Sequence, residues 1–98
     1  MTPDTLRRSA TEEATPPQDL PAPLRALWWD ARGDWTRAHE AAQEGKDADS
    51  AWVHAYLHRR EGDLANADYW YRRARRTRPE TTLEAEWAAI AAALLNPR

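Results

Sequence analysis

The chain has 98 residues, 42% of them hydrophobic, and a formal net charge of −2 at pH 7, a length that leaves room for one small domain. It contains no Cys, which excludes disulfides, zinc fingers and thiol catalysis. A net charge so close to zero points to neither a nucleic-acid nor a membrane partner. The longest apolar run, residues 87–95, is far shorter than the roughly 20 residues that span a bilayer. With no apolar leader after its basic start, the chain is expected to be cytoplasmic.

Residues 1–23 are rich in proline and polar side chains and poor in large apolar ones. Such a segment cannot bury enough apolar surface to offset the entropy lost on ordering. We therefore expect a mostly disordered, flexible tail over residues 1–23, with a short helical stretch around residues 6–14. The folded domain is expected over residues 24–98.

Two helices are predicted next along the chain. Pro23 suits the first position of a helix, because its missing N–H group costs nothing there. The apolar stripe that follows ends at Gly33, a residue type that favours the left-handed turn closing a helix. Asp34 can then cap a second helix, which runs from Trp35 to about Glu44.

Three further helices are predicted in the second half of the chain. One runs over residues 51–61 and the next over residues 64–76, after which Pro79 prevents continuation. The last is capped by Thr81 or Thr82. Its apolar face repeats with the helical period of 3.6 residues and consists of Leu83, Trp87, Ile90, Ala91 and Leu94.

The two helical hairpins formed by the first four of these helices repeat the same turn chemistry. A shift of 29 positions places Gly33 and Asp34 on Gly62 and Asp63. Gly adopts the left-handed conformation that ends one helix, and Asp caps the next. The same shift places Ala26 on Ala55 and Ala38 on Ala67. We therefore interpret the two hairpins as a repeat.

Residues 62–74, with the sequence GDLANADYWYRRA, resemble the second helix of a tetratricopeptide repeat, and Pro79 lies where that family places a terminating proline. Residues 51–61 look like the first helix, with Ala55 at the small-residue contact position. The resemblance covers residues 24–95 and departs from the family in its period, which is shorter than 34 residues. It implies an all-α fold of two antiparallel hairpins with a C-terminal capping helix. Residues 54–63, with the sequence HAYLHRREGD, followed by YWYRRA at residues 69–74, are also similar to a set of short bacterial proteins, a likeness that brings no activity with it.

The leading functional hypothesis is a small non-enzymatic adaptor that binds a protein or peptide. In tetratricopeptide-like arrays the first helix of each hairpin lines a concave groove, which here would show Trp52, Tyr56, Arg59 and Arg60. An aromatic floor beside two guanidinium groups suits a peptide with an acidic residue or a C-terminal carboxylate, because Arg binds carboxylates through two parallel hydrogen bonds. The alternative is that the two rings pack against the next helix and the Arg pair is solvated.

The second hypothesis is that an Arg-rich segment beside Trp70 binds nucleic acid or a phosphate-containing ligand. Its candidate residues are Trp70, Arg72, Arg73, Arg75 and Arg76. Arg side chains contact phosphates, while an aromatic ring can stack on a base. The simpler interpretation is electrostatic, since cations near a helix C-terminus are favoured by the helix macrodipole.

The three histidines suggest a third hypothesis, a metal site or small enzyme. His54 and His58 are four residues apart, so both rings project from one face of a helix, where the repeat family has Leu and Tyr. His39 could add a third ligand. Packing is the preferred interpretation, because a His at such a position can hydrogen-bond a Trp, a Tyr or an Asp. No set of residues has the spacing of a catalytic group, so we expect neither an enzyme nor a bound cofactor or metal.

Trp28 and Trp29 are adjacent, so their side chains point about 100° apart and cannot both face one core. An exposed indole often marks an interface. Two hairpins with one closing helix are also near the minimum for a stable array. A homodimer is therefore a further hypothesis.

Overall fold

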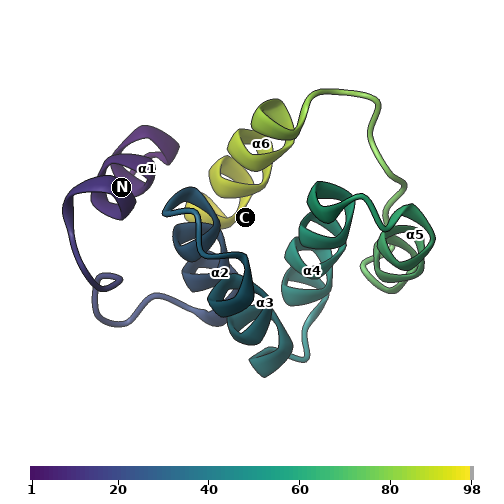
Figure 1. The fold of residues 1–98 in the computed structure, drawn as a ribbon, viewed down its shortest axis with the longest axis horizontal. Coiled ribbons are helices and arrows are strands. Elements are labelled where there is room, and N and C mark those ends of the chain that lie inside the picture. Colours follow the sequence, from purple (N-terminus) through teal and green to yellow (C-terminus); the bar gives the residue numbers. More distant parts are fainter. Residues whose placement is uncertain (98) are drawn as a thin grey trace.

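Six α-helices build the fold, which the computed structural model describes for residues 1–97 (Figure 1). They are α1 (Pro3–Glu12), α2 (Ala22–Ala31), α3 (Trp35–Glu44), α4 (Ala48–Glu61), α5 (Leu64–Arg73) and α6 (Leu83–Leu95). No strand occurs within residues 1–97. The all-α class predicted from the sequence is therefore confirmed. No helix in this part of the chain is long and apolar enough to cross a membrane.

The turns within the α2–α3 and α4–α5 pairs have the chemistry expected from the repeated Gly-Asp dipeptide. Gly33 and Gly62 adopt left-handed φ values of 89° and 91°. The side chains of Asp34 and Asp63 each accept a hydrogen bond from the backbone N–H three residues further on. The two turns are therefore alike in both the helix end and the helix cap.

Replacing Gly62 by Ala should lower the free energy of unfolding by about 1 kcal/mol, because an L-residue in the left-handed conformation is strained. No atom lies within 4 Å of the place that a new Cβ would take, so the loss reports backbone strain alone. Gly62→Asn is the control and should lose less, since Asn tolerates this conformation. Urea unfolding followed by Trp fluorescence measures both variants. Equal stability of Gly62→Ala and wild type would contradict the prediction.

In the second half of the chain, two helix boundaries differ from the predicted ones by three residues each. α4 begins three residues earlier, because Asp47 caps it by accepting a hydrogen bond of 3.2 Å from the backbone N–H of Ser50. α5 ends at Arg73, short of the predicted Arg76, because Arg75 adopts a left-handed φ of 62°.

The N-terminal segment differs most from the sequence expectation. Instead of the expected disordered tail, residues 3–12 form α1, in which Leu6 and Ala10 have no exposed surface. The indole N–H of Trp28 donates a hydrogen bond of 3.0 Å to the hydroxyl of Ser9. A short helical stretch was expected around residues 6–14, but overall composition did not reveal that this helix docks on the domain. Only one face of a helix must be apolar for it to dock, and an average over the segment does not register a face.

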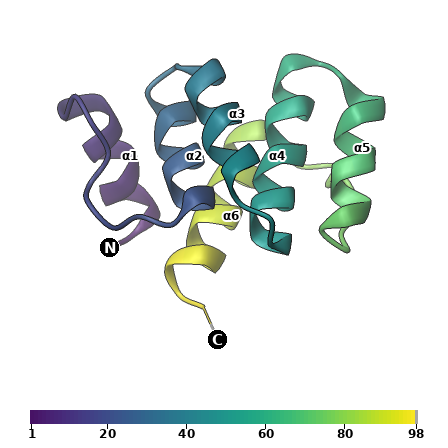
Figure 2. The ribbon, with the colours of Figure 1, turned by 90° about the horizontal axis from the view of Figure 1, so that it is seen from below.

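The first five helices stand side by side in one layer, and α6 crosses one face of it (Figure 2). α2 packs on α3 and α4 packs on α5, while contacts between α3 and α4 join the two pairs. α1 packs against α2, and α6 contacts α1, α2 and α4. α4 is therefore enclosed by its neighbours, and residues 51–58 are all buried.

α6 is anchored by Trp87, whose ring N–H donates a hydrogen bond of 3.1 Å to the backbone carbonyl of Leu27 in α2. Ile90 and Ala91, one turn further on, have no exposed surface. From α1, the guanidinium carbon of Arg7 lies 4.5 Å from the centroid of the Trp87 ring. α6 thus closes over a face of the layer rather than only capping the end of the row.

The adjacent tryptophans both pack within the chain. Trp28 has no exposed surface, and Trp29 is half-buried, with the guanidinium carbon of Arg37 at 4.8 Å from its ring. No Trp is among the exposed large apolar side chains of residues 1–97, which are Met1, Leu64 and Tyr69. The homodimer stays a prediction, without the exposed indole that motivated it.

Candidate functional site

The four residues of the predicted partner-binding groove lie together on α4, but three of them are engaged within the fold. Tyr56 is 1% exposed, and its hydroxyl donates a hydrogen bond of 2.9 Å to Asp30. Arg60 pairs with the same carboxylate at 3.2 Å. Arg59 pairs with Glu86 of α6 at 2.7 Å. An incoming peptide would have to displace these partners to reach the three side chains.

The electrostatics of Asp30 and Tyr56 also suit an internal contact. Burial raises the pKa of the Asp30 carboxyl above its ordinary value, while the hydrogen bond from Tyr56 and the charge of Arg60 act in the opposite direction. The pKa of the Tyr56 hydroxyl is raised, mainly by burial and secondly by the charge of Asp30. The phenol therefore stays protonated and acts as a hydrogen-bond donor that ties α4 to α2.

Trp52, the fourth predicted residue, lines an open groove of about 770 Å³ between the end of α5 and α6, here called the Arg groove. Its other lining residues are Arg72, Arg75, Arg76, Thr77, Pro79, Thr81, Glu86 and Ala89. The guanidinium carbon of Arg76 lies 3.3 Å from the centroid of the Trp52 ring. Residues that belonged to two different hypotheses therefore meet in one groove.

The three Arg side chains of this groove carry charge that nearby carboxylates do not neutralise. Within residues 1–97, none of the three forms an ion pair. The carboxylate among the lining residues, Glu86, already binds Arg59 and accepts a hydrogen bond from the hydroxyl of Tyr71. The groove is therefore locally positive in a chain whose net charge is −2.

Arg75 has a backbone conformation that usually belongs to Gly. Its φ is 62°, and across this turn the backbone N–H of Arg76 donates a hydrogen bond of 2.8 Å to the carbonyl of Tyr71, a helix ending that favours Gly at the left-handed position. A residue with a side chain costs about 1 kcal/mol or more there. Because strained positions cluster at binding sites, Arg75 is a candidate ligand-binding residue.

The other two members of the predicted anion-binding set, Trp70 and Arg73, do not line the groove. The guanidinium carbon of Arg73 lies 5.1 Å from the ring centroid of Trp70, and the Trp70 ring stacks on His54 at 3.9 Å. Trp52 likewise lies beneath Arg76 and is 8% exposed. Base stacking needs an open aromatic face, so this arrangement suits a carboxylate better than a nucleic-acid base.

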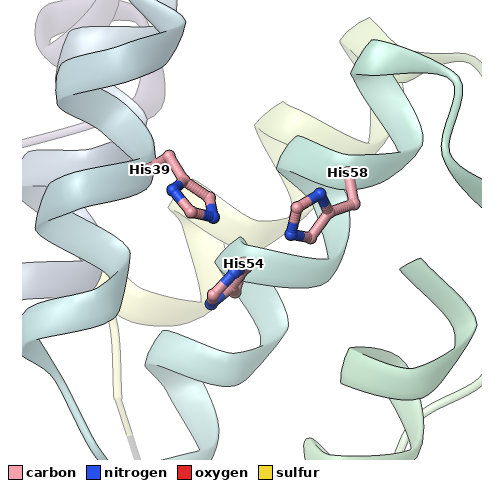
Figure 3. Close-up of side chains that lie close together, drawn as sticks. All are labelled: His39, His54 and His58. Atoms are coloured by element: carbon pink, nitrogen blue, oxygen red, sulfur yellow. The ribbon is translucent and has the colours of Figure 1, made fainter. Parts of the chain in front are cut away.

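The three histidines come together where α3 packs on α4 (Figure 3). The centroid of the His39 ring lies 4.6 Å from that of His54 and 5.1 Å from that of His58. The pKa of His54 is lowered to about 4, mainly by burial and to a smaller extent by the charges of the other two rings. The pKa of His39 is also lowered, mainly by burial. His39 and His54 are therefore neutral at pH 7, and each has one ring nitrogen without a proton that can act as a ligand.

The buried carboxylate of the Arg groove and the carboxylate beside the histidines were not among the predicted site residues. Glu86 lies one turn from both Leu83 and Ile90, on the apolar face of α6. A charged residue within an apolar face is the sequence feature that could have indicated a buried ion pair. Glu61 follows His58 by three residues, a spacing that places both on one helix face. One of its carboxylate oxygens lies 2.6 Å from Nδ1 of His58.

No protein-family model matches the chain, and no curated protein and no solved structure is significantly similar to it. The likeness to tetratricopeptide repeats therefore stays a prediction.

Proposed function

We propose that the protein is a small non-enzymatic interaction module, and that the Arg groove binds an acidic segment of a partner protein. The observation that carries this proposal is a groove with three guanidinium groups beside a Trp ring, in which the carboxylate of Glu86 is already paired. Arg binds carboxylates through paired, charge-assisted hydrogen bonds. Acidic side chains or a C-terminal carboxylate are therefore the matching ligand groups.

The size and composition of the groove support a short peptide segment as the ligand. A volume of about 770 Å³ lies within the range of pockets that hold small ligands, and it accommodates a few side chains rather than a folded partner. Arg is among the residue types that most often dominate binding energy at interfaces, and Trp52 supports Arg76 from beneath. Arg75, whose strained backbone keeps a long cationic side chain at the groove, fits the same role.

We further propose that the α2–α3 and α4–α5 pairs are two repeats of the tetratricopeptide type, in a cytoplasmic bacterial protein. The matching φ values of Gly33 and Gly62, and the matching Asp caps that follow them, support this proposal. In such an array the groove would lie along α2 and α4, the first helix of each pair. α6 covers those two helices, so the ligand surface moves to the Arg groove at the end of the row.

A fluorescein-labelled hexaglutamate peptide should bind the wild-type protein in a fluorescence-anisotropy titration. The double variant Arg72→Ala with Arg76→Ala should bind at least about tenfold more weakly, since hydrogen bonds to charged groups contribute about 1.5–3 kcal/mol each. Arg73→Ala is the matched control. It removes an Arg from the same segment that does not line the groove, so binding should be nearly unchanged.

A hexaglutamine peptide of the same length tests whether charge is recognised, and it should not bind. Equal weakening in Arg73→Ala and in the double variant would contradict the proposal, because it would indicate general electrostatic attraction. Tighter binding of a single-stranded oligonucleotide, with the steep salt dependence of phosphate contacts, would make nucleic acid the ligand instead.

A further inference from the structure

All three histidines of the chain meet at the contact between α3 and α4, away from the Arg groove (Figure 3). His39 comes from α3, while His54 and His58 lie one turn apart on α4. One ring nitrogen from each lies within 4.8 Å of one ring nitrogen of the others. Nitrogens about 2.0–2.1 Å from a shared zinc ion are roughly 3.3 Å apart in a tetrahedral site. The rings must therefore move toward one another when an ion binds.

Aromatic neighbours hold two of the three rings in place. The His39 ring stacks on Trp35, with centroids 4.8 Å apart and planes at 10°. The His54 ring stacks on Trp70, with centroids 3.9 Å apart and planes at 12°. Trp35 is itself fixed by a hydrogen bond of 2.9 Å from its ring N–H to the carbonyl of Leu57. Packing of this kind preorganises side chains for a ligand.

Glu61 orients the third ring. Its carboxylate oxygen lies 2.6 Å from Nδ1 of His58. Because a carboxylate accepts hydrogen bonds, Nδ1–H is the donor to Glu61, which leaves Nε2 as the acceptor nitrogen of the ring. A carboxylate that accepts the second ring N–H is the usual outer partner of a metal-binding His, and it raises the basicity of the ligating nitrogen. Within residues 1–97, Nε2 meets only the amide nitrogen of Asn66, at 3.4 Å. A contact this long is readily displaced by a stronger ligand.

The interpretation of these rings as packing residues predicts hydrogen bonds to Trp, Tyr or Asp. Among residues 1–97, no hydrogen bond reaches a ring nitrogen of His39 or His54, and the partners of His58 are Glu61 and Asn66. His54 is 4% exposed, but among residues 1–97 the fully buried side-chain polar atom without a partner is the hydroxyl of Ser50. The ring nitrogens of His54 therefore keep some contact with solvent, from which an ion can reach them. A single metal ion would give all three rings a partner at once.

We propose that His39, His54 and His58 form a binding site for one divalent transition-metal ion, with Zn²⁺ the best match. Imidazole nitrogens suit zinc, copper and nickel, whereas magnesium and calcium prefer oxygen ligands. Three His ligands with an open fourth position are an established arrangement for zinc. The chain has no Cys that could compete as a ligand. Because the ion joins α3 to α4, its binding links the first helical pair to the second.

Calorimetric titration of the untagged, metal-free protein with ZnCl₂ tests the site, since a polyhistidine tag would add competing ligands. We expect one ion per chain and a rise in Tm of roughly 10 °C or more at a hundredfold excess over Kd. Titration with CoCl₂ gives a second readout, because the visible absorption bands of Co²⁺ report a four-coordinate site directly.

The variants separate the ligands from their surroundings. His39→Gln keeps a polar side chain against Trp35 but removes one ligand, and should weaken Zn²⁺ binding by about 100-fold or more. Glu61→Gln should weaken binding roughly 10- to 100-fold, with the Tm of the metal-free protein nearly unchanged because Glu61 is exposed. Glu80→Gln, at another exposed carboxylate, is the matched control and should bind like wild type.

The proposal would be overturned if the folded wild-type protein gave no heat of binding with ZnCl₂ and no visible absorption bands with CoCl₂. Binding that survives both His39→Gln and His54→Asn would also overturn it, by assigning the ion to surface carboxylates. Should His54→Asn fail to fold, His39→Gln decides alone, because His39 is only half-buried. The result is independent of peptide binding, since the Arg-groove variants leave the three histidines unchanged.

Discussion

Replacing Glu86 by Ala is expected to lower the free energy of unfolding by roughly 3 to 5 kcal/mol. The Glu86 side chain is 3% exposed, pairs with Arg59 at 2.7 Å and accepts a hydrogen bond from the hydroxyl of Tyr71. Its removal leaves a largely buried guanidinium and a buried phenol without their shared acceptor. Because small domains are stable by only about 5 to 15 kcal/mol, urea unfolding should show a large fall in the midpoint.

Two further variants test whether the loss of stability comes from the buried ion pair. Glu84→Ala removes an exposed carboxylate from the same first turn of α6 and should cost no more than about 1 kcal/mol. The double variant Arg59→Met with Glu86→Leu should recover part of the loss, since it removes both charges together. A loss for Glu86→Ala no larger than that for Glu84→Ala would show that the pair does not hold α6 against α4.

Replacing Leu6 by Ala is expected to cost roughly 2 to 5 kcal/mol, as for other buried leucines. Leu6 has no exposed surface in α1, and α1 packs against α2 and α6. In a flexible tail the same substitution would be neutral. Thermal unfolding followed by circular dichroism therefore tests whether the N-terminal helix is part of the folded domain.

Arg8→Ala is the matched control for Leu6→Ala, because Arg8 is exposed on the same helix. Limited proteolysis adds a local readout, since undocking of α1 would expose this helix, with its buried Leu6 and Ala10, to cleavage. We expect faster cleavage in Leu6→Ala than in Arg8→Ala or wild type. The same Tm and the same cleavage rate in all three proteins would contradict a docked α1.

The candidate sites show which part of a site a sequence pattern can reveal. The common face of His54 and His58 follows from their spacing on one helix, and so does the position of Glu61 near His58. Whether His39 joins them depends on how α3 packs on α4, which spacing along the chain does not specify. In the same way, Trp52 and Arg76 belonged to separate predicted sites until the packing of α4 against α5 and α6 brought them into one groove.

Local chemistry explains the features that were predictable. Gly33 and Gly62 end helices, and Asp34 and Asp63 begin the next ones, because a left-handed turn or a cap involves only residues within a few positions. α1 docks, and α6 crosses α2 and α4, through contacts between residues far apart in the chain, such as that from Trp87 to Leu27. Such contacts form where the apolar area buried exceeds the entropy lost on closing long loops. The positions of the helices along the chain thus follow from neighbouring residues. The faces that stay open for ligands follow from the packing of residues that are distant in the sequence.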